Sequence, residues 1–218
     1  MTDRYHGTAR TEILDWLPSQ VARMLDVGCG TGATTAAVKR VRDVRWAGGL
    51  EFVEEVAARA EPVFDRVWRG DAARACIEDA IAPKSLDLVL CLDVLEHMAD
   101  PWTMVRRLSA LLAPAGRLIL SVPNIRHWKF LWRLAAQGDF TYRDAGLLDR
   151  THLRFFVRAT AVELATGAGL RLVAAVPAHD WAPADARTIL SRVSGGRTDE
   201  WTAKQWLVVA EQTANSQA

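Results

Sequence analysis

The stretch LDVGCGTG at residues 25–32 decides the fold of this chain. It follows a short apolar run at 22–27 and leads into an amphipathic segment at 32–41, so a glycine-rich turn joins a predicted strand to a predicted helix. Glycines at such a turn let the backbone approach a ligand closely, and the N-terminus of the following helix offers unpaired N–H groups to polar ligand atoms. The stretch therefore predicts a ligand-binding loop near the start of an α/β fold.

Short apolar runs alternate with amphipathic segments from this loop to Pro123. The predicted strands are 22–27, 44–50, 66–68, 86–92 and 117–122, and the predicted helices are 32–41, 52–60, 72–81 and 101–112. Such βα alternation indicates a parallel sheet with helices on both faces. Pro114-Ala115-Gly116 predicts a turn into the fifth strand, and Pro123 ends that strand because it lacks an N–H donor.

The pattern changes after Pro123. Helical spacing is found at Ile125, Trp128, Leu131, Trp132 and Ala135, and periodicity is lost over 137–148, so we predict an inserted lid at about 124–158. Beyond it we expect a helix at 160–168 stopped by Gly169, strands at 170–176 and 204–210, and a loop-rich stretch at 177–200.

Composition limits the class of protein. A length of 218 residues predicts a single domain over 1–218 that carries this insertion. Lys+Arg 27 against Asp+Glu 26 gives a net charge of +1, so no global field recruits nucleic acid. Three cysteines without a CxxC pair favour reduced thiols and a cytoplasmic protein. The apolar stretch 86–95 is broken by Asp87 and Asp93, and we expect neither an export signal nor a membrane span.

The glycine-rich loop alone leaves two ligand classes open. Gly28-x-Gly30-x-x-Ala33 also satisfies the dinucleotide fingerprint, with Glu51 near the distance expected for a ribose-binding acid. A NAD(P)-dependent oxidoreductase is therefore one alternative.

Four motifs in order give the chain a more specific resemblance. Asp26 with the following DVGCGTG loop, and Gly49-Leu50-Glu51, resemble the first two motifs of the class I S-adenosylmethionine-dependent methyltransferases. Gly70-Asp71-Ala72 and the stretch 86–97 resemble the next two motifs of that family. The resemblance is strong over 25–122 and looser over 160–210. It implies a Rossmann-like α/β fold with a mostly parallel seven-stranded sheet, helices on both faces and an antiparallel last strand. It also implies that the chain is an enzyme that uses S-adenosylmethionine and releases S-adenosylhomocysteine.

The same resemblance implies the cofactor-binding residues. In it the loop wraps the methionine portion, Glu51 accepts from the ribose hydroxyls, and Asp71 accepts from the adenine amino group. The whole set is Asp26, Gly28, Cys29, Gly30, Gly32, Glu51, Phe52, Asp71, Ala72, Leu92 and Asp93. Three alternatives stay open here: Asp71 as a helix cap, Phe52 as a core residue, and Asp93 as a cap of the following turn.

His97 and His152 are the candidate catalytic residues. Methyl transfer depends mainly on alignment, but a histidine near its reference pKa can remove the proton of a hydroxyl acceptor. Quinone-type methyltransferases of the family bind a divalent cation through an acid-x-x-Glu-His string; here Asp93 stands first, and we predict no metal site. His152 lies in DRTHLRFF, 149–156, which resembles bacterial methyltransferases of surface-glycan or secondary-metabolite pathways. Structural roles for both histidines, a metal-ligand role for His97, and a core role for Phe155 and Phe156 stay open.

The segment 124–158 carries seven basic and three acidic residues, a balance of +4, with Trp128, Phe130 and Trp132 interleaved. Such a lid could grip an anionic sugar nucleotide, cover a lipid-linked acceptor or contact a membrane surface, or it could be a solvated helix face with core aromatics. We predict methyl transfer to a small molecule, to oxygen rather than nitrogen, with a sugar or lipid-linked metabolite as acceptor. The non-enzyme alternative is an interfacial binding module on the same fold.

Overall fold

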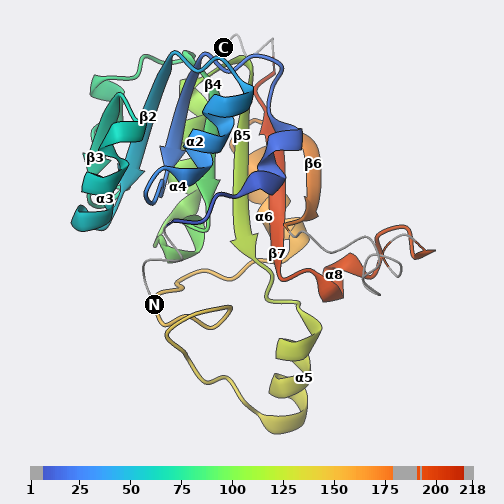
Figure 1. The fold of residues 1–218 in the computed structure, drawn as a ribbon. Helices are drawn as coiled ribbons and strands as arrows, with labels where there is room; N and C mark the ends of the chain where they lie inside the picture. The colour runs from blue at the N-terminus through green and yellow to red at the C-terminus, as the bar shows by residue number, and fades with distance from the viewer. Residues whose placement is uncertain (1–6, 179–190, 192, 214–218) are drawn as a thin grey trace.

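The computed structural model describes residues 7–178, 191 and 193–213. Within this part of the chain seven strands form one sheet in the order β3-β2-β1-β4-β5-β7-β6 (Figure 1). Neighbouring strands among β1 to β5 are parallel, and β7 lies antiparallel between β5 and β6. The strands are β1 Arg23–Val27, β2 Trp46–Glu51, β3 Arg66–Arg69, β4 Leu86–Leu92, β5 Leu112–Pro123, β6 Arg171–Pro177 and β7 Gln205–Glu211. This is the Rossmann-like fold class predicted from the sequence.

Helices cover both faces of the sheet because alternate strand residues point to opposite sides. On one face, residues such as Leu25 and Val89 pack with α4 (Pro101–Leu111) and α6 (Arg158–Thr166). On the other face, Met24 and Leu88 pack with η1 (Thr11–Trp16) and α2 (Ala33–Val41). No helix in the described residues is long and apolar enough to cross a membrane. The helices are α2 Ala33–Val41, α3 Glu54–Ala60, α4 Pro101–Leu111, α5 Trp128–Gln137, α6 Arg158–Thr166 and α8 Asp199–Thr202, and the 3-10 turns are η1 Thr11–Trp16, η2 Glu61–Val63, η3 Ile77–Asp79 and η4 Leu95–His97.

The helix predicted at 72–81 is wrong, since this segment forms turns and the short η3. Ile77 and Ile81 are both buried, which explains the helical spacing of apolar residues in the sequence. Arg107 of α4 donates hydrogen bonds to the carbonyl oxygens of Ala72, at 3.1 Å, and of Ala75. These carbonyls are thereby engaged by a distant side chain rather than by the N–H groups of a helix.

Strand β5 also begins earlier than predicted. Leu112 pairs with Leu86, and the register shifts before Arg117 pairs with Leu88. The predicted turn at Pro114-Ala115-Gly116 is an irregularity within the strand, where Ala115 has a φ of 62°. Pro123 ends β5, as predicted.

The carboxyl ends of the parallel strands share one edge of the sheet, and the segment containing α5 hangs beneath that edge (Figure 1). The segment leaves and rejoins the fold at neighbouring points, because Asn124 forms a bridge with Phe156 and the Ile125 N–H donates to the Phe156 carbonyl at 2.9 Å. Within it, 138–150 is irregular, as expected from the lost periodicity. Of the stretch predicted as loop-rich at 177–200, residues 179–190 and 192 lie outside the described residues.

Candidate functional site

The loop after β1 is held between the ends of two neighbouring strands. The N–H groups of Gly28 and Cys29 both donate to the Leu50 carbonyl of β2, at 2.7 and 3.0 Å. Gly28 has a φ of 73°, and a Cβ added there would lie 2.2 Å from Cγ2 of Val94. Gly30 and Gly32 also have positive φ values. The loop therefore needs glycine for its backbone conformation and, at position 28, for its contact with the turn after β4.

Glu51, the last residue of β2, holds this loop through hydrogen bonds to backbone N–H groups. Its carboxylate is buried and accepts from the Gly30 N–H at 2.9 Å through Oε2 and from the Val53 N–H at 3.0 Å through Oε1. Each carboxylate oxygen can accept a further hydrogen bond, so Glu51 keeps the capacity to bind a pair of hydroxyl groups. The adjacent Phe52 is 73% exposed, so its core alternative is wrong and its ring is free to pack against a ligand.

Asp26 lies directly below the loop, fully inside the protein. The Thr35 hydroxyl donates to its Oδ2 at 2.7 Å. Burial raises the pKa of Asp26 to about 7, and the nearby Glu51 carboxylate contributes in the same direction. Burial also raises the pKa of the Cys29 thiol, so this thiol is neutral and serves as a small apolar side chain. A cationic ligand group would favour the ionised form of Asp26.

Asp71 lies on the exposed side of the site, after β3. Its Oδ1 accepts from the Ala73 N–H at 2.9 Å, so Asp71 caps a turn. The alternative role of Asp71 as a helix cap does not apply, because no helix forms at 72–81. The neighbouring Ala72 is buried. Nothing lies within 4 Å of a Cβ built on Gly70, so the backbone directly before Asp71 is open to a ligand.

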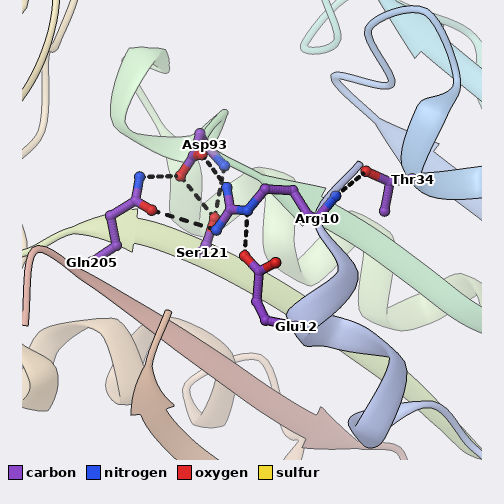
Figure 2. Close-up of polar contacts among 6 residues, drawn as sticks. All are labelled: Arg10, Glu12, Thr34, Asp93, Ser121 and Gln205. Atoms are coloured by element: carbon purple, nitrogen blue, oxygen red, sulfur yellow. Dashed lines mark hydrogen bonds and ion pairs between the residues drawn. The ribbon is translucent and has the colours of Figure 1, made fainter. Parts of the chain in front are cut away.

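Asp93, just beyond Leu92 at the end of β4, is held by side chains from three distant segments (Figure 2). Its Oδ1 accepts from the Ser121 hydroxyl at 2.8 Å and from Gln205 Nε2 at 2.9 Å, and its Oδ2 pairs with Arg10. The alternative in which Asp93 caps the following turn is therefore wrong. The residue has a φ of 57°, which turns its side chain toward these partners.

Arg10 is the site residue that the sequence analysis missed. Its guanidinium pairs with Asp93 and Glu12, and its backbone N–H donates to the Thr34 hydroxyl at 3.1 Å (Figure 2). Arg10 thus joins the segment before β1 to α2 and to the end of β4. Its partner Asp93 is 83 positions away in sequence, so no local pattern could identify it.

The structure brings His97 and His152 together, although 54 residues separate them in sequence. Their ring centroids lie 4.8 Å apart in an edge-to-face arrangement. Nδ1 of His97 lies 2.9 Å from Oγ1 of Thr151, and Nδ1 of His152 lies 3.0 Å from the Leu147 carbonyl oxygen. Burial lowers the pKa of His97, and the neighbouring His152 adds to this, so His97 is neutral at pH 7.

Glu96 is buried beside the two imidazoles. Burial raises the pKa of its carboxyl well above the ordinary value, and the charge of Asp93 reinforces the effect. Its Oε2 has no hydrogen-bond partner within the described residues. One oxygen of Glu96 and one nitrogen of each imidazole all lie within 4.8 Å of one another, an arrangement that suits a hydroxyl group and is also wide enough for a cation. The prediction that no metal binds is untested.

The segment 124–158 combines buried and exposed aromatic residues. Phe130 and Phe156 are buried, and Phe155 packs edge-to-face with Phe140 at 6.3 Å. In contrast, Trp128 and Trp132 of α5 are 48% and 63% exposed. The alternative of core aromatics therefore holds for Phe130 and Phe156, whereas Phe155 is half-buried and the two tryptophans are exposed.

Comparisons with known proteins agree on one family. The methyltransferase domain family matches residues 3–175. A ubiquinone biosynthesis O-methyltransferase of Xanthomonas campestris pv. campestris (strain B100) is 30% identical over 172 residues, which cover 72% of this chain and 71% of that protein. One from Xylella fastidiosa (strain M23) is 29% identical over 175 residues, covering 72% and 69%.

Solved structures show the same fold at lower identity. A methyltransferase from Archaeoglobus fulgidus has a TM-score of 0.65 at 16% identity, covering 93% of this chain and 92% of that one. A methyltransferase from Mesorhizobium loti has a TM-score of 0.63 at 18% identity, covering 95% and 100%.

Proposed function

This chain belongs to the class I S-adenosylmethionine-dependent methyltransferases, and from that premise we propose that it methylates a hydroxyl group of a small-molecule acceptor. Its cofactor is S-adenosylmethionine. Family membership decides against the NAD(P)-dependent oxidoreductase and the non-catalytic binding module, the two alternatives left by the sequence. The acceptor and the roles of the individual residues are the subject of the proposal.

The loop and strand ends fit the cofactor. We assign the ribose hydroxyls to Glu51, whose two oxygens are already fixed by backbone N–H groups and keep acceptor capacity. We assign the adenine to the exposed ring of Phe52 and the carboxylate of Asp71, beside the open backbone at Gly70. We assign the cationic end of the ligand to Asp26 and to Asp93, whose charge is partly balanced by Arg10, together with the loop 28–32 and Leu92.

His97 carries the proposed chemistry on the acceptor side. S-adenosylmethionine supplies a methyl group bound to a sulfonium sulfur. When the methyl group is transferred, the sulfur keeps the bonding electrons and becomes a neutral thioether. The imidazole of His97 lies in the 3-10 turn η4 after β4, and a neutral imidazole has one acceptor nitrogen that can take the hydroxyl proton. The single observation behind this assignment is the contact between His97 in the turn after β4 and His152 of the segment 124–158. His152 contributes a second nitrogen that orients the acceptor.

The segment 124–158 is proposed as a lid within a single domain. It lies beneath the carboxyl edge of the sheet, and its residue His152 is brought to the catalytic turn (Figure 1). A lid that excludes water strengthens electrostatic interactions and aligns the acceptor with the methyl group.

Phenols and quinols are the acceptors that we propose first. The two relatives are named for ubiquinone biosynthesis, and the exposed Trp128 and Trp132 beside basic residues suit an aromatic or lipid-linked acceptor. Sugar nucleotides come second, because the local charge of +4 over 124–158 also suits an anionic acceptor.

The test is an acceptor screen with S-adenosylmethionine labelled in the methyl group. We expect label transfer to phenols or quinols, and a loss of turnover of about 10²-fold or more in the His97→Gln variant with cofactor affinity unchanged. Glu55→Gln, an exposed change on α3, is the control. Label transfer to amines alone, or full turnover by His97→Gln, would contradict the proposal.

A further inference from the structure

A threonine hydroxyl lies between a carboxylate and the imidazole of His97. Oγ1 of Thr151 is 2.6 Å from Oδ1 of Asp149, and the Thr151 N–H donates to the same oxygen at 2.9 Å. On its other side, Oγ1 is 2.9 Å from Nδ1 of His97. Asp149, Thr151 and His97 therefore form a continuous chain of hydrogen bonds from the lid to the turn after β4.

The protons in this chain can be assigned by counting donors. Partial burial works against ionisation of Asp149, but the two bonds from Thr151 and the nearby imidazoles outweigh it and hold the pKa of Asp149 below its usual value. An ionised carboxylate only accepts hydrogen bonds, so the single hydroxyl proton of Thr151 points to Asp149. Oγ1 then offers His97 only a lone pair, and Nδ1 of His97 must carry the proton of that bond.

A second contact leads to the same tautomer. The carbonyl oxygen of Thr151 lies 3.3 Å from Nδ1 of His97, and a carbonyl can only accept. In a neutral imidazole with its proton on Nδ1, the lone pair is on Nε2. Nδ1 of His152 also carries a proton, because it faces the Leu147 carbonyl oxygen.

We propose that Asp149 and Thr151 are positioning residues, which hold neutral His97 as its Nδ1–H tautomer and so present the Nε2 lone pair to the acceptor hydroxyl. This inference rests on the proposed function of His97 as the base. In the step, the hydroxyl proton passes to Nε2, the acceptor oxygen forms the bond to the methyl carbon, and the carbon–sulfur bond breaks with its electrons on sulfur. The resulting imidazolium is stabilised through Thr151 by the charge of Asp149.

The lid is anchored independently of this chain, which makes the inference testable by mutation. The N–H groups of Leu153 and Arg154 both donate to the Glu96 carbonyl, at 2.7 and 3.0 Å. These backbone bonds remain when the Thr151 side chain is changed. A Thr151→Val variant is thus expected to keep the lid on the catalytic turn while removing the hydroxyl.

The chain also contains a matched control. Thr141 follows Asp139 as Thr151 follows Asp149, and its N–H donates to Asp139 Oδ1 at 2.9 Å. Both threonines are exposed residues of the lid. The Asp139–Thr141 pair involves Arg133 rather than a histidine. Thr141→Val therefore makes the same chemical change in the same local motif away from His97.

The primary experiment is ¹⁵N NMR of the imidazole nitrogens in the full chain at pH 8, which needs no acceptor. We expect His97 to show a protonated Nδ1 and an unprotonated Nε2 in the wild type, in Thr151→Ser and in Thr141→Val. In Thr151→Val we expect the two tautomers to mix. With an acceptor from the screen, Thr151→Val should lose about tenfold to a hundredfold in kcat without a change in cofactor affinity, and Thr151→Ser should restore most of it.

The outcomes separate this inference from the proposed function. An Nε2–H tautomer in the wild type, or unchanged tautomer and turnover in Thr151→Val, would overturn the inference. An equal loss in Thr141→Val and Thr151→Val would also overturn it, because the effect would belong to the lid as a whole. Full turnover by His97→Gln overturns the proposed function instead, whatever the tautomer of His97 is.

Discussion

Replacing Glu51 by alanine should weaken cofactor binding while leaving the sheet intact. Hydrogen bonds to a charged group contribute about 1.5–3 kcal/mol. Taken as the net loss of the ribose contacts, this corresponds to a dissociation constant raised about 10-fold to about 150-fold. The substitution also removes the acceptor of the Gly30 and Val53 N–H groups, so the loop after β1 loses its internal support. We expect the free energy of unfolding to fall by about 1–3 kcal/mol.

Isothermal titration calorimetry with S-adenosylhomocysteine measures the binding effect directly, because no acceptor is needed. Glu51→Gln keeps the shape and one acceptor oxygen and should fall between the wild type and Glu51→Ala. Glu55→Ala is the matched control, since Glu55 is an exposed acid on the adjoining helix α3. Circular dichroism and denaturant titration establish that each variant is folded.

Two results would refute the reasoning. A folded Glu51→Ala variant with a dissociation constant within twofold of the wild type would show that Glu51 does not bind the ribose. An equal loss in Glu55→Ala would show that the effect is one of overall charge.

Three further predictions concern the candidate cofactor site. Calorimetry should detect binding of S-adenosylmethionine and its demethylated product but not of NAD or NADP, and tight nicotinamide binding alone would contradict the assignment of Glu51 and Asp71. Gly28→Ala should lower the free energy of unfolding by about 1–3 kcal/mol in denaturant titrations, because its Cβ would lie 2.2 Å from Val94 Cγ2 at a φ of 73°. Adding Val94→Ala should recover the part of this loss that comes from the contact, but not the part that comes from the backbone conformation. A Gly28→Ala variant as stable as the wild type would refute the argument. Burial raises the pKa of Asp26 to about 7, so between about pH 4 and pH 7 the folded protein holds a proton that the unfolded chain has released. The free energy of unfolding should therefore fall over this range as the pH rises, by up to about 1.4 kcal/mol per pH unit relative to Asp26→Asn. Parallel pH profiles of the wild type and Asp26→Asn would contradict this prediction.

Local patterns predicted the features of the fold that local residues determine. The glycine-rich loop and strands such as β4 are recognisable because glycine spacing and apolar runs act over a few positions. The segment 72–81 was mispredicted because Arg107 of α4 engages its carbonyl groups from a distance. Phe52 was left open as a core residue because hydrophobicity alone does not tell a buried ring from one that faces a ligand site.

The candidate site shows the same division. Each candidate cofactor residue lies near the carboxyl end of a strand or shortly after it and could be found from a motif, whereas Arg10 reaches Asp93 only through the folded arrangement. The meeting of His97 and His152 likewise depends on how the lid folds back, which no periodicity in 137–148 specifies. Protonation states such as that of Glu96 follow from burial and therefore require the structure.

Main-chain groups make part of the seam between lid and core, beside side-chain bonds such as the one between Thr151 and His97, and this bears on how new acceptor preferences arise. The bridge at Asn124 and Phe156, and the bonds from Leu153 and Arg154 to Glu96, require backbone N–H and carbonyl groups but no particular side chains. We therefore expect segments of different length and composition to be exchangeable between these attachment points without a shift in the register of the sheet. If the segment determines the acceptor, as proposed, substrate range and cofactor use can diverge separately, and grafting a relative's segment at 124–156 is a direct test.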